Sequence, residues 1–141
     1  MWSTSSALEA SGVSAEALWS KAYADARVWP RWNTALASAE PEGPFEVGSR
    51  TRVRFRTGLR LRFTLVEVEP ERVFTDEGRL PGARMGHRHA IEPTDDGVRL
   101  TNTLYLDGPL ARLWALVVGP QVKRGLPEWQ RKAVDVAKQG S

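Results

Sequence analysis

Residues 50–65 read RTRVRFRTGLRLRFTL, and this stretch decides the fold class. Apolar residues and arginines alternate on both sides of Gly58, and a period of two is typical of β-strands with one dry face and one wet face. For both apolar sets to share a face, the connecting loop must contain an odd number of residues. We therefore expect the loop Thr57-Gly58-Leu59, with Gly58 at a positive φ. This loop pairs Phe55 with Leu61 and Val53 with Phe63.

The arginines of this hairpin form the wet face. The same register sets Arg56 opposite Arg60 and Arg54 opposite Arg62. Like charges directly opposite one another destabilise a sheet. Two influences would offset the repulsion, an anionic partner or acidic neighbours such as Asp76 and Glu46. No aromatic residues interleave the arginines to stack on bases, so we expect a solvated face rather than a nucleic-acid site.

Further strands are expected near 1–10, 72–77, 84–92 and 98–106. Between the last two, Asp96-Gly97 is a strong hairpin signal, and as a two-residue turn it pairs Asp95 with Val98. Counting outward gives the pairs Ile91–Asn102, His89–Leu104 and His87–Leu106. One face of this hairpin therefore mixes apolar and polar groups: Met85, His87, His89, Ile91, Asn102, Leu104 and Leu106. The alternation changes along 65–68, which indicates a bulge and leaves open which way four side chains face: Glu67, Glu69, Thr75 and Glu77.

Apolar residues recur at helical spacing in two segments, one after Ser14 and one at the C-terminal end of the chain. Ser14 is placed to cap a first helix. Pro30 is expected to end this helix, because the residue before a proline, here Trp29, is disfavoured in the helical backbone conformation. The apolar stripe of this helix is Leu18, Trp19, Ala22, Tyr23 and Ala26. The C-terminal helix has two stripes, Leu110, Leu113, Leu116 and Val117, then Leu126, Trp129, Ala133 and Val136. Prolines at 120 and 127 interrupt it, so we expect a kinked or two-piece helix.

Length and composition limit the number of domains and the class of protein. A chain of 141 residues with ordinary apolar and charged fractions predicts one globular domain, residues 1–141. There is no cysteine, which excludes disulfides and thiolate metal sites. No apolar run approaches the ~20 residues that span a bilayer, and the first residues lack the features of a signal peptide, so a cytoplasmic protein is expected. The net charge of +3 is only a weak indication of nucleic-acid binding.

Several short segments resemble those of one superfamily. They are VWPRWN at 28–33, GPFEVG at 43–48, VEVEP at 66–70, RLPG at 79–82 and GPL at 108–110. The order of elements is a strand, a helix, a tryptophan-rich break, antiparallel strands and a C-terminal helix. Together these features make nearly the whole chain similar to the START-like (SRPBCC) superfamily, in its polyketide cyclase/dehydrase-like branch.

The resemblance implies an α+β helix-grip fold, in which a curved antiparallel β-sheet wraps around a long C-terminal α-helix, with two short helices after the first strand. Members of this superfamily bind lipids, polyketides or aromatic molecules in a cavity between sheet and helix, and no cofactor is implied. We expect a cavity of roughly a few hundred Å³, with the helix around 119–127 as its flexible gate. The expected ligand-site residues are Trp32, Phe55, Leu61, Phe63, Met85, His87, His89, Ile91, Asn102, Leu104, Trp114 and Val117.

His87 and His89 are the only histidines and share one strand face. Metal binding is disfavoured, because zinc sites need three or four protein ligands and no cysteine or well-spaced carboxylate completes the set. In the simplest interpretation the two imidazoles are polar groups of the cavity wall, satisfied by Asn102, water or a backbone carbonyl. We favour a further role, in which they orient the polar end of a bound apolar ligand.

Three functions follow as hypotheses. The first is a binding protein for a small hydrophobic molecule. The second is a cyclase- or dehydratase-like enzyme in which His87 or His89 moves protons at an enolisable substrate. The third is a protein that binds an anionic partner through its arginine face. The oligomeric state is open, with a homodimer as one possibility.

Overall fold

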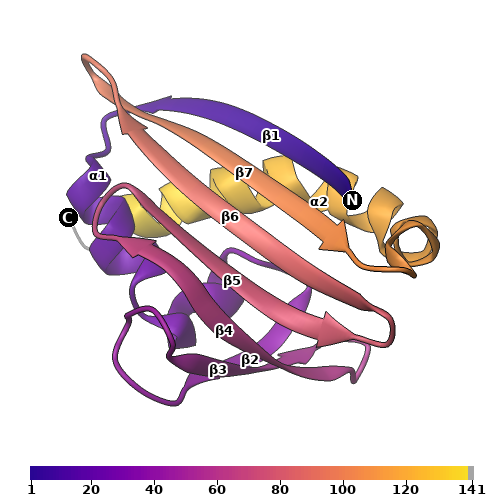
Figure 1. Cartoon of the computed structure of the whole chain (residues 1–141). Helices are drawn as coiled ribbons and strands as arrows, with labels where there is room; N and C mark the ends of the chain where they lie inside the picture. Colours follow the sequence, from indigo (N-terminus) through magenta and orange to yellow (C-terminus); the bar gives the residue numbers. More distant parts are fainter. Residues whose placement is uncertain (140–141) are drawn as a thin grey trace.

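The computed structural model describes residues 1–139, in which a curved antiparallel sheet holds a long helix against one face (Figure 1). The strands are β1 (Trp2–Ser11), β2 (Leu36–Pro41), β3 (Arg50–Phe55), β4 (Arg60–Glu69), β5 (Val73–Leu80), β6 (Ala83–Pro93) and β7 (Gly97–Asp107). Their order in the sheet is β1-β7-β6-β5-β4-β3-β2, so the first two strands form its two edges. Helix α2 (Ala111–Lys138) is the helix that the sheet grips, which confirms the predicted helix-grip fold.

The chain between β1 and β2 forms three short helical segments. They are α1 (Ala15–Leu18), the π-helical turn η1 (Trp19–Tyr23) and the 3-10 helix η2 (Ala26–Arg31). Ser14 caps α1 as predicted, because its hydroxyl accepts a hydrogen bond from the Ala17 amide. Pro30 does not end the first helix as expected. The break comes earlier, at Asp25, whose carboxylate caps η2, and Pro30 lies within η2. The predicted apolar stripe is buried throughout.

Strand β2 is an element that the sequence did not predict. It reads LASAEP, and alanine and serine have little preference for strands. Its position at the edge of the sheet, paired only with β3, tolerates the proline at its end. Pairing with β3, rather than local preference, therefore forms this strand. The predicted bulge in β4 is confirmed, because the pairing with β5 shifts between Leu65 and Glu67.

The β3–β4 hairpin has the predicted odd loop and a positive φ at Gly58, but its register differs. The loop is Arg56-Thr57-Gly58, closed by a hydrogen bond from the Phe55 amide to the Leu59 carbonyl. A loop of this length needs the left-handed conformation at its last position, so Gly58 ends the loop instead of occupying its centre. The observed pairs are Val53–Leu61, Arg52–Arg62 and Arg54–Arg60. The register moves by two residues, so both apolar sets still share the inner face.

The β6–β7 hairpin is also displaced by two residues from its predicted register. The turn is Asp95-Asp96 rather than Asp96-Gly97, because the Thr94 amide bonds to the Gly97 carbonyl at 2.9 Å. Gly97 is needed for a different reason: an added Cβ would lie 1.9 Å from the Ala10 carbonyl oxygen of the adjacent strand β1. The observed pairs are Ile91–Leu100, His89–Asn102 and His87–Leu104.

Helix α2 is continuous from Ala111 to Lys138, with Pro120 and Pro127 inside it, so it is not in two pieces. Its first turns, orange in Figure 1, run at an angle to the yellow remainder, which shows a bend. The second predicted stripe is buried against the sheet, whereas the first is exposed. None of the helices in residues 1–139 combines the length and the apolar character needed to cross a membrane.

Candidate functional site

A cavity of about 340 Å³ lies between the sheet and α2. Its wall is formed by β3 to β7, by residues 29–36, by the β3–β4 loop and by α2. Four tryptophans contribute to it, Trp29, Trp32, Trp114 and Trp129. A largely apolar cavity with a few polar groups is typical of a site for a small hydrophobic molecule.

The structure brings most of the predicted ligand-site residues together around this cavity. Those in its wall are Trp32, Phe55, Phe63, Met85, His87, His89, Leu104, Trp114 and Val117. Three others lie outside it. Ile91 packs in the core opposite Leu100, Leu61 packs beside the cavity wall, and Asn102 lies behind His87. Ile91 lies two residues beyond His89 on β6 and packs in the core, and the Asn102 side chain bonds to His87 and Gln130. That the lining residues bind a ligand stays a prediction.

Three polar side chains meet in the wall where β5 and β6 pair. Asp76 lies directly opposite His87, and the ring centroids of His87 and His89 are 3.7 Å apart. The expectation that Asp76 lies outside, beside the arginines, is wrong, because only 7% of this residue is exposed and it lines the cavity. The signal was present in the alternation of β5: Phe74 and Leu80 are apolar, and Asp76 has the same parity.

A chain of hydrogen bonds fixes the tautomer of His87. The Gln130 side-chain amide donates to the Ser6 carbonyl at 2.8 Å and to Asn102 Oδ1 at 3.3 Å. Asn102 therefore presents its Nδ2 group, which can only donate, to His87 Nε2 at 3.4 Å. His87 Nε2 must then accept, and the ring proton resides on Nδ1. His87 thus offers an N–H donor from a ring held in place from behind.

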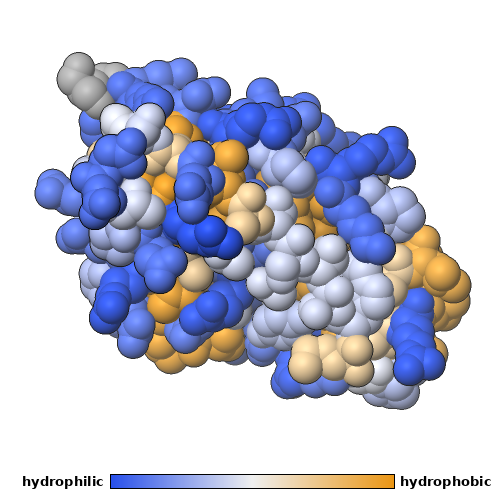
Figure 2. All heavy atoms as spheres, turned by 90° about the horizontal axis from the view of Figure 1, so that it is seen from above, coloured by the Kyte–Doolittle hydropathy of each residue, from blue (hydrophilic) through white to orange (hydrophobic). Residues whose placement is uncertain are grey.

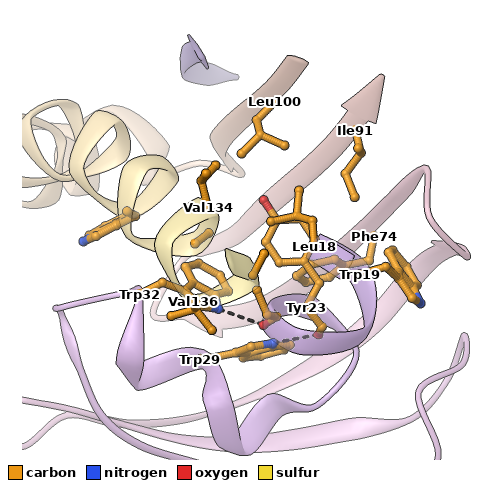
Figure 3. Close-up of a cluster of buried hydrophobic side chains, with 14 of the residues drawn as sticks. Leu18, Trp19, Tyr23, Trp29, Trp32, Phe74, Ile91, Leu100, Val134 and Val136 are labelled. Atoms are coloured by element: carbon orange, nitrogen blue, oxygen red, sulfur yellow. Dashed lines mark hydrogen bonds between the residues drawn. The ribbon is translucent and has the colours of Figure 1, made fainter. Parts of the chain in front are cut away.

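His89 is enclosed by aromatic rings. Its ring stacks on Phe74 at 4.0 Å, and the rings of Tyr23 and Trp32 lie edge-on at 5.4 and 5.6 Å. Trp32 is anchored by a hydrogen bond from its indole to the Ala22 carbonyl, and Trp29 by one to the Tyr23 carbonyl (Figure 3). Within residues 1–139, neither ring nitrogen of His89 has a hydrogen-bond partner of acceptable geometry. A buried polar group left in this way costs about 1–3 kcal/mol, so a polar ligand atom would be bound favourably here.

Burial sets the charge of all three groups. It lowers the pKa of His87 to about 3. Burial, and then the neighbouring His87, lower the pKa of His89 well below its ordinary value. Burial, with a contribution from the charge of Glu77, raises the pKa of Asp76 to about 7. Near neutral pH, both imidazoles are therefore uncharged and the Asp76 carboxyl is partly protonated.

This arrangement can recognise neutral polar groups and can move protons. Uncharged imidazoles and a half-protonated carboxyl offer donors and acceptors without a compensating cation, which suits a hydroxyl or carbonyl group better than a carboxylate. A carboxyl that titrates near pH 7 is also suited to general acid–base chemistry. Although Asp76, His87 and His89 lie together, no group of three or more His, Cys, Asp or Glu side chains within residues 1–139 is arranged to hold a metal ion.

The outer face of β3 and β4 carries facing pairs of arginines, but Arg56, which was predicted among them, lies in the β3–β4 loop and lines the cavity. The facing pairs are Arg52–Arg62 and Arg54–Arg60, not those of the predicted register. Neither expected acid offsets them: Asp76 lies inside, and Arg62 pairs with Glu42 at 2.8 Å rather than with Glu46. The four side chains whose facing was open are now placed: Glu67 accepts from Thr75 and Arg88, Glu77 from Tyr105, and Glu69 is exposed. An anionic partner on this face stays a prediction.

Comparison with known proteins gives a consistent picture. The sequence matches the profile of the family described as polyketide cyclase / dehydrase and lipid transport over residues 1–135. A solved structure from Mesorhizobium loti superposes with a TM-score of 0.78 at 18% identity, and the match covers 99% of each chain. A protein from Nitrosomonas europaea gives 0.74 at 14% identity, over 99% of this chain and 96% of that one.

A third similar structure is that of the di-domain ARO/CYC StfQ from the steffimycin biosynthetic pathway. It gives a TM-score of 0.76 at 14% identity, over 97% of this chain and 50% of that one. At these identities the structural likeness shows the fold alone. No curated protein matches the chain.

Proposed function

Because the chain belongs to the polyketide cyclase/dehydrase and lipid transport family, we propose that it binds a small hydrophobic molecule in the cavity between the sheet and α2. The polar end of this molecule would lie against His87, His89 and Asp76. The observation that carries the proposal is His89, which is 2% exposed, has two unpartnered ring nitrogens within the described residues, and forms part of the cavity wall. A ligand group that bonds to one of these nitrogens would satisfy the buried imidazole, and this supports the proposal.

The polar groups narrow the class of ligand. The apolar wall favours an aromatic or alicyclic body, and the uncharged imidazoles favour a neutral hydroxyl or carbonyl at one end. A ligand with a carboxylate at that end would lie against uncharged imidazoles and beside the partly ionised Asp76 carboxyl, which disfavours a second negative charge. A phenol of naphthalene size is therefore a suitable probe.

Replacing His89 by phenylalanine tests this proposal with 1-naphthol and naphthalene as probes. The variant keeps an aromatic ring in the cage and removes both nitrogens. We expect the affinity for 1-naphthol to fall by about tenfold, while the affinity for naphthalene stays unchanged, as measured by isothermal titration calorimetry. A variant that binds both probes as the wild type does would remove His89 from the site. A wild-type protein that binds neither would contradict the cavity as a binding site for molecules of this class.

A second candidate function, acid–base catalysis, is favoured by the position of Asp76. This carboxyl and His87 lie opposite each other in the cavity wall, and the similar structure of an ARO/CYC protein shows that the fold is used by a cyclase. In such a role the Asp76 carboxylate would take a proton from the carbon next to a bound carbonyl, and the His87 Nδ1–H group would donate a hydrogen bond to the resulting enolate oxygen.

Deuterium exchange at the enolisable carbon of α-tetralone tests the catalytic role. We expect the wild-type protein to accelerate the exchange, and Asp76→Asn to slow it by about a hundredfold, with exchange followed by proton NMR at pH 7.5. Calorimetric binding of 1-naphthol, expected to persist in the variant, shows that the cavity is intact. A protein that binds 1-naphthol but does not accelerate exchange would have the binding function without this chemistry.

A further inference from the structure

The first part of α2 presents apolar side chains to the outside. Leu113, Leu116 and Val117 are 57%, 79% and 65% exposed, and Leu110 is 42% exposed. Their spacing places them on one side of the helix. We call these four residues the α2 stripe. Figure 2 shows an apolar patch at the end of the molecule where α2 begins. Scattered exposed apolar residues are normal, but a contiguous group of this kind marks an interaction surface.

The α2 stripe is continuous with the cavity. Val117 belongs to the stripe and also to the cavity wall, and its helical neighbours Trp114 and Val118 line the cavity as well. On the other side, Leu59 in the β3–β4 hairpin is 47% exposed and also forms part of the wall. The exposed apolar surface therefore adjoins the opening through which an apolar ligand would pass.

The surroundings of the α2 stripe are basic. Residues 108–127 include Arg112, Lys123 and Arg124 but no aspartate or glutamate, and all three basic side chains are exposed. The β3–β4 hairpin adds Arg56 and Arg60 close to Leu59 in the chain. Apolar side chains flanked by lysine and arginine are the pattern by which a helix lies on an anionic bilayer.

We propose that the α2 stripe docks the mouth of the cavity onto the surface of an anionic lipid bilayer. Leu110, Leu113 and Leu116 would enter the headgroup region, and Arg112, Lys123 and Arg124 would contact lipid phosphates. The purpose of such docking rests on the proposed function, since an apolar ligand could then pass between bilayer and cavity without crossing water. A second copy of the chain fits this surface less well, because an isologous contact would bring the same basic residues together.

Co-sedimentation with vesicles tests the docking. We expect the wild-type protein to bind vesicles of phosphatidylcholine and phosphatidylglycerol, and to bind phosphatidylcholine vesicles more weakly. Leu116→Glu, which places a charge in the stripe without altering the cavity wall, is expected to reduce partitioning by about tenfold or more. The matched control is Val47→Glu in the β2–β3 loop, where Val47 is 61% exposed, and this variant should bind as the wild type does. Equal binding by Leu116→Glu and the wild type would overturn the proposal.

Two further measurements distinguish docking by the α2 stripe from docking by the arginine face and from self-association. Arg52→Glu changes the arginine face, and loss of vesicle binding in this variant but not in Leu116→Glu would assign the membrane contact to that face and overturn the proposal. A wild-type dimer in solution that Leu116→Glu converts to a monomer would assign the stripe to a second copy and would also overturn it. Binding of 1-naphthol by Leu116→Glu, expected to be unchanged, shows that a failure of docking is distinct from a failure of ligand binding.

Discussion

Asp76→Asn is expected to stabilise the protein at pH 8 by up to about 4 kcal/mol. The carboxyl of Asp76 has an ordinary pKa of 3.8 in the unfolded chain, and burial raises its pKa to about 7 in the folded one. The folded protein therefore holds the proton more tightly. The contribution of this carboxyl to stability is greatest below pH 3.8, falls as the pH rises towards 7, and stays low above it, because the ionised carboxylate is then buried. Asparagine cannot ionise, so the variant avoids this loss.

The gain should depend on pH in a defined way. It is expected to shrink by about 1.4 kcal/mol for each pH unit below 7 and to become small near pH 4, close to the ordinary pKa of 3.8, below which the wild-type carboxyl is protonated in both states. Urea denaturation at pH 4, 6 and 8 measures it. Asp95→Asn in the exposed β6–β7 turn is the control for the loss of one charge. A gain for Asp76→Asn that is the same at all three pH values would show that Asp76 ionises normally in the folded protein.

The two histidines change the stability with pH in the opposite direction to Asp76. Burial lowers the pKa of His87 to about 3 from 6.5, and the pKa of His89 is lowered in the same sense. Below pH 6.5 the unfolded chain takes up protons that the folded protein excludes, so each histidine costs stability as the pH falls. In the wild type, protonation of Asp76 offsets part of this cost. The stability of Asp76→Asn should therefore decrease more steeply between pH 7 and pH 4 than that of the wild type.

Trp32→Ala is expected to cost about 3–5 kcal/mol of unfolding free energy. Only 2% of Trp32 is exposed, its ring lies 5.5 Å from that of Tyr23 and 5.6 Å from that of His89, and its indole donates to the Ala22 carbonyl. The substitution would remove this packing, leave a buried carbonyl without its donor and merge the core with the cavity. Urea denaturation followed by circular dichroism measures the loss.

Trp114→Ala is the matched control for Trp32→Ala. Trp114 also lines the cavity and also donates its indole N–H to a carbonyl, that of Pro81 at 2.7 Å, but it is only half-buried in the first part of α2. We expect this variant to lose less than half as much stability, since a half-exposed ring removes less apolar surface from water. Equal losses in the two variants would mean that the start of α2 packs as firmly as the core, and would argue against its role as an exposed docking surface.

The outline of the fold was predictable because strand alternation reports the face of a residue even when the register is wrong. His87 and His89 were placed on the inner face correctly, although their partners are Leu104 and Asn102 rather than the expected residues. The register itself depended on what each glycine does. Gly58 supplies the left-handed end of a loop, whereas Gly97 makes room for the backbone of β1. The second role requires a strand from the other end of the sequence, which no local pattern reveals.

The candidate site was predicted less completely than the fold. Asp76 was assigned to the arginine face because of its charge, although its alternation with Phe74 placed it inside. The protonation states could not be predicted, because they follow from burial by residues of several elements. Neither could the exposure of the α2 stripe, since apolar residues at helical spacing indicate a packed face and do not show whether another element covers it.

The contact between β1 and α2 bears on how the protein is made. Gln130 bonds to the Ser6 backbone and side chain, which lie 124 positions away, and also contacts Asn102, the residue that orients His87. During synthesis β1 emerges before α2, so the hydrogen bonds between Ser6 and Gln130 can form only after α2 has been made. Contacts between such distant parts of a chain slow folding. The ligand site should therefore be completed late, after the rest of the sheet has assembled, and nascent chains that lack α2 should leave the histidine face open to water.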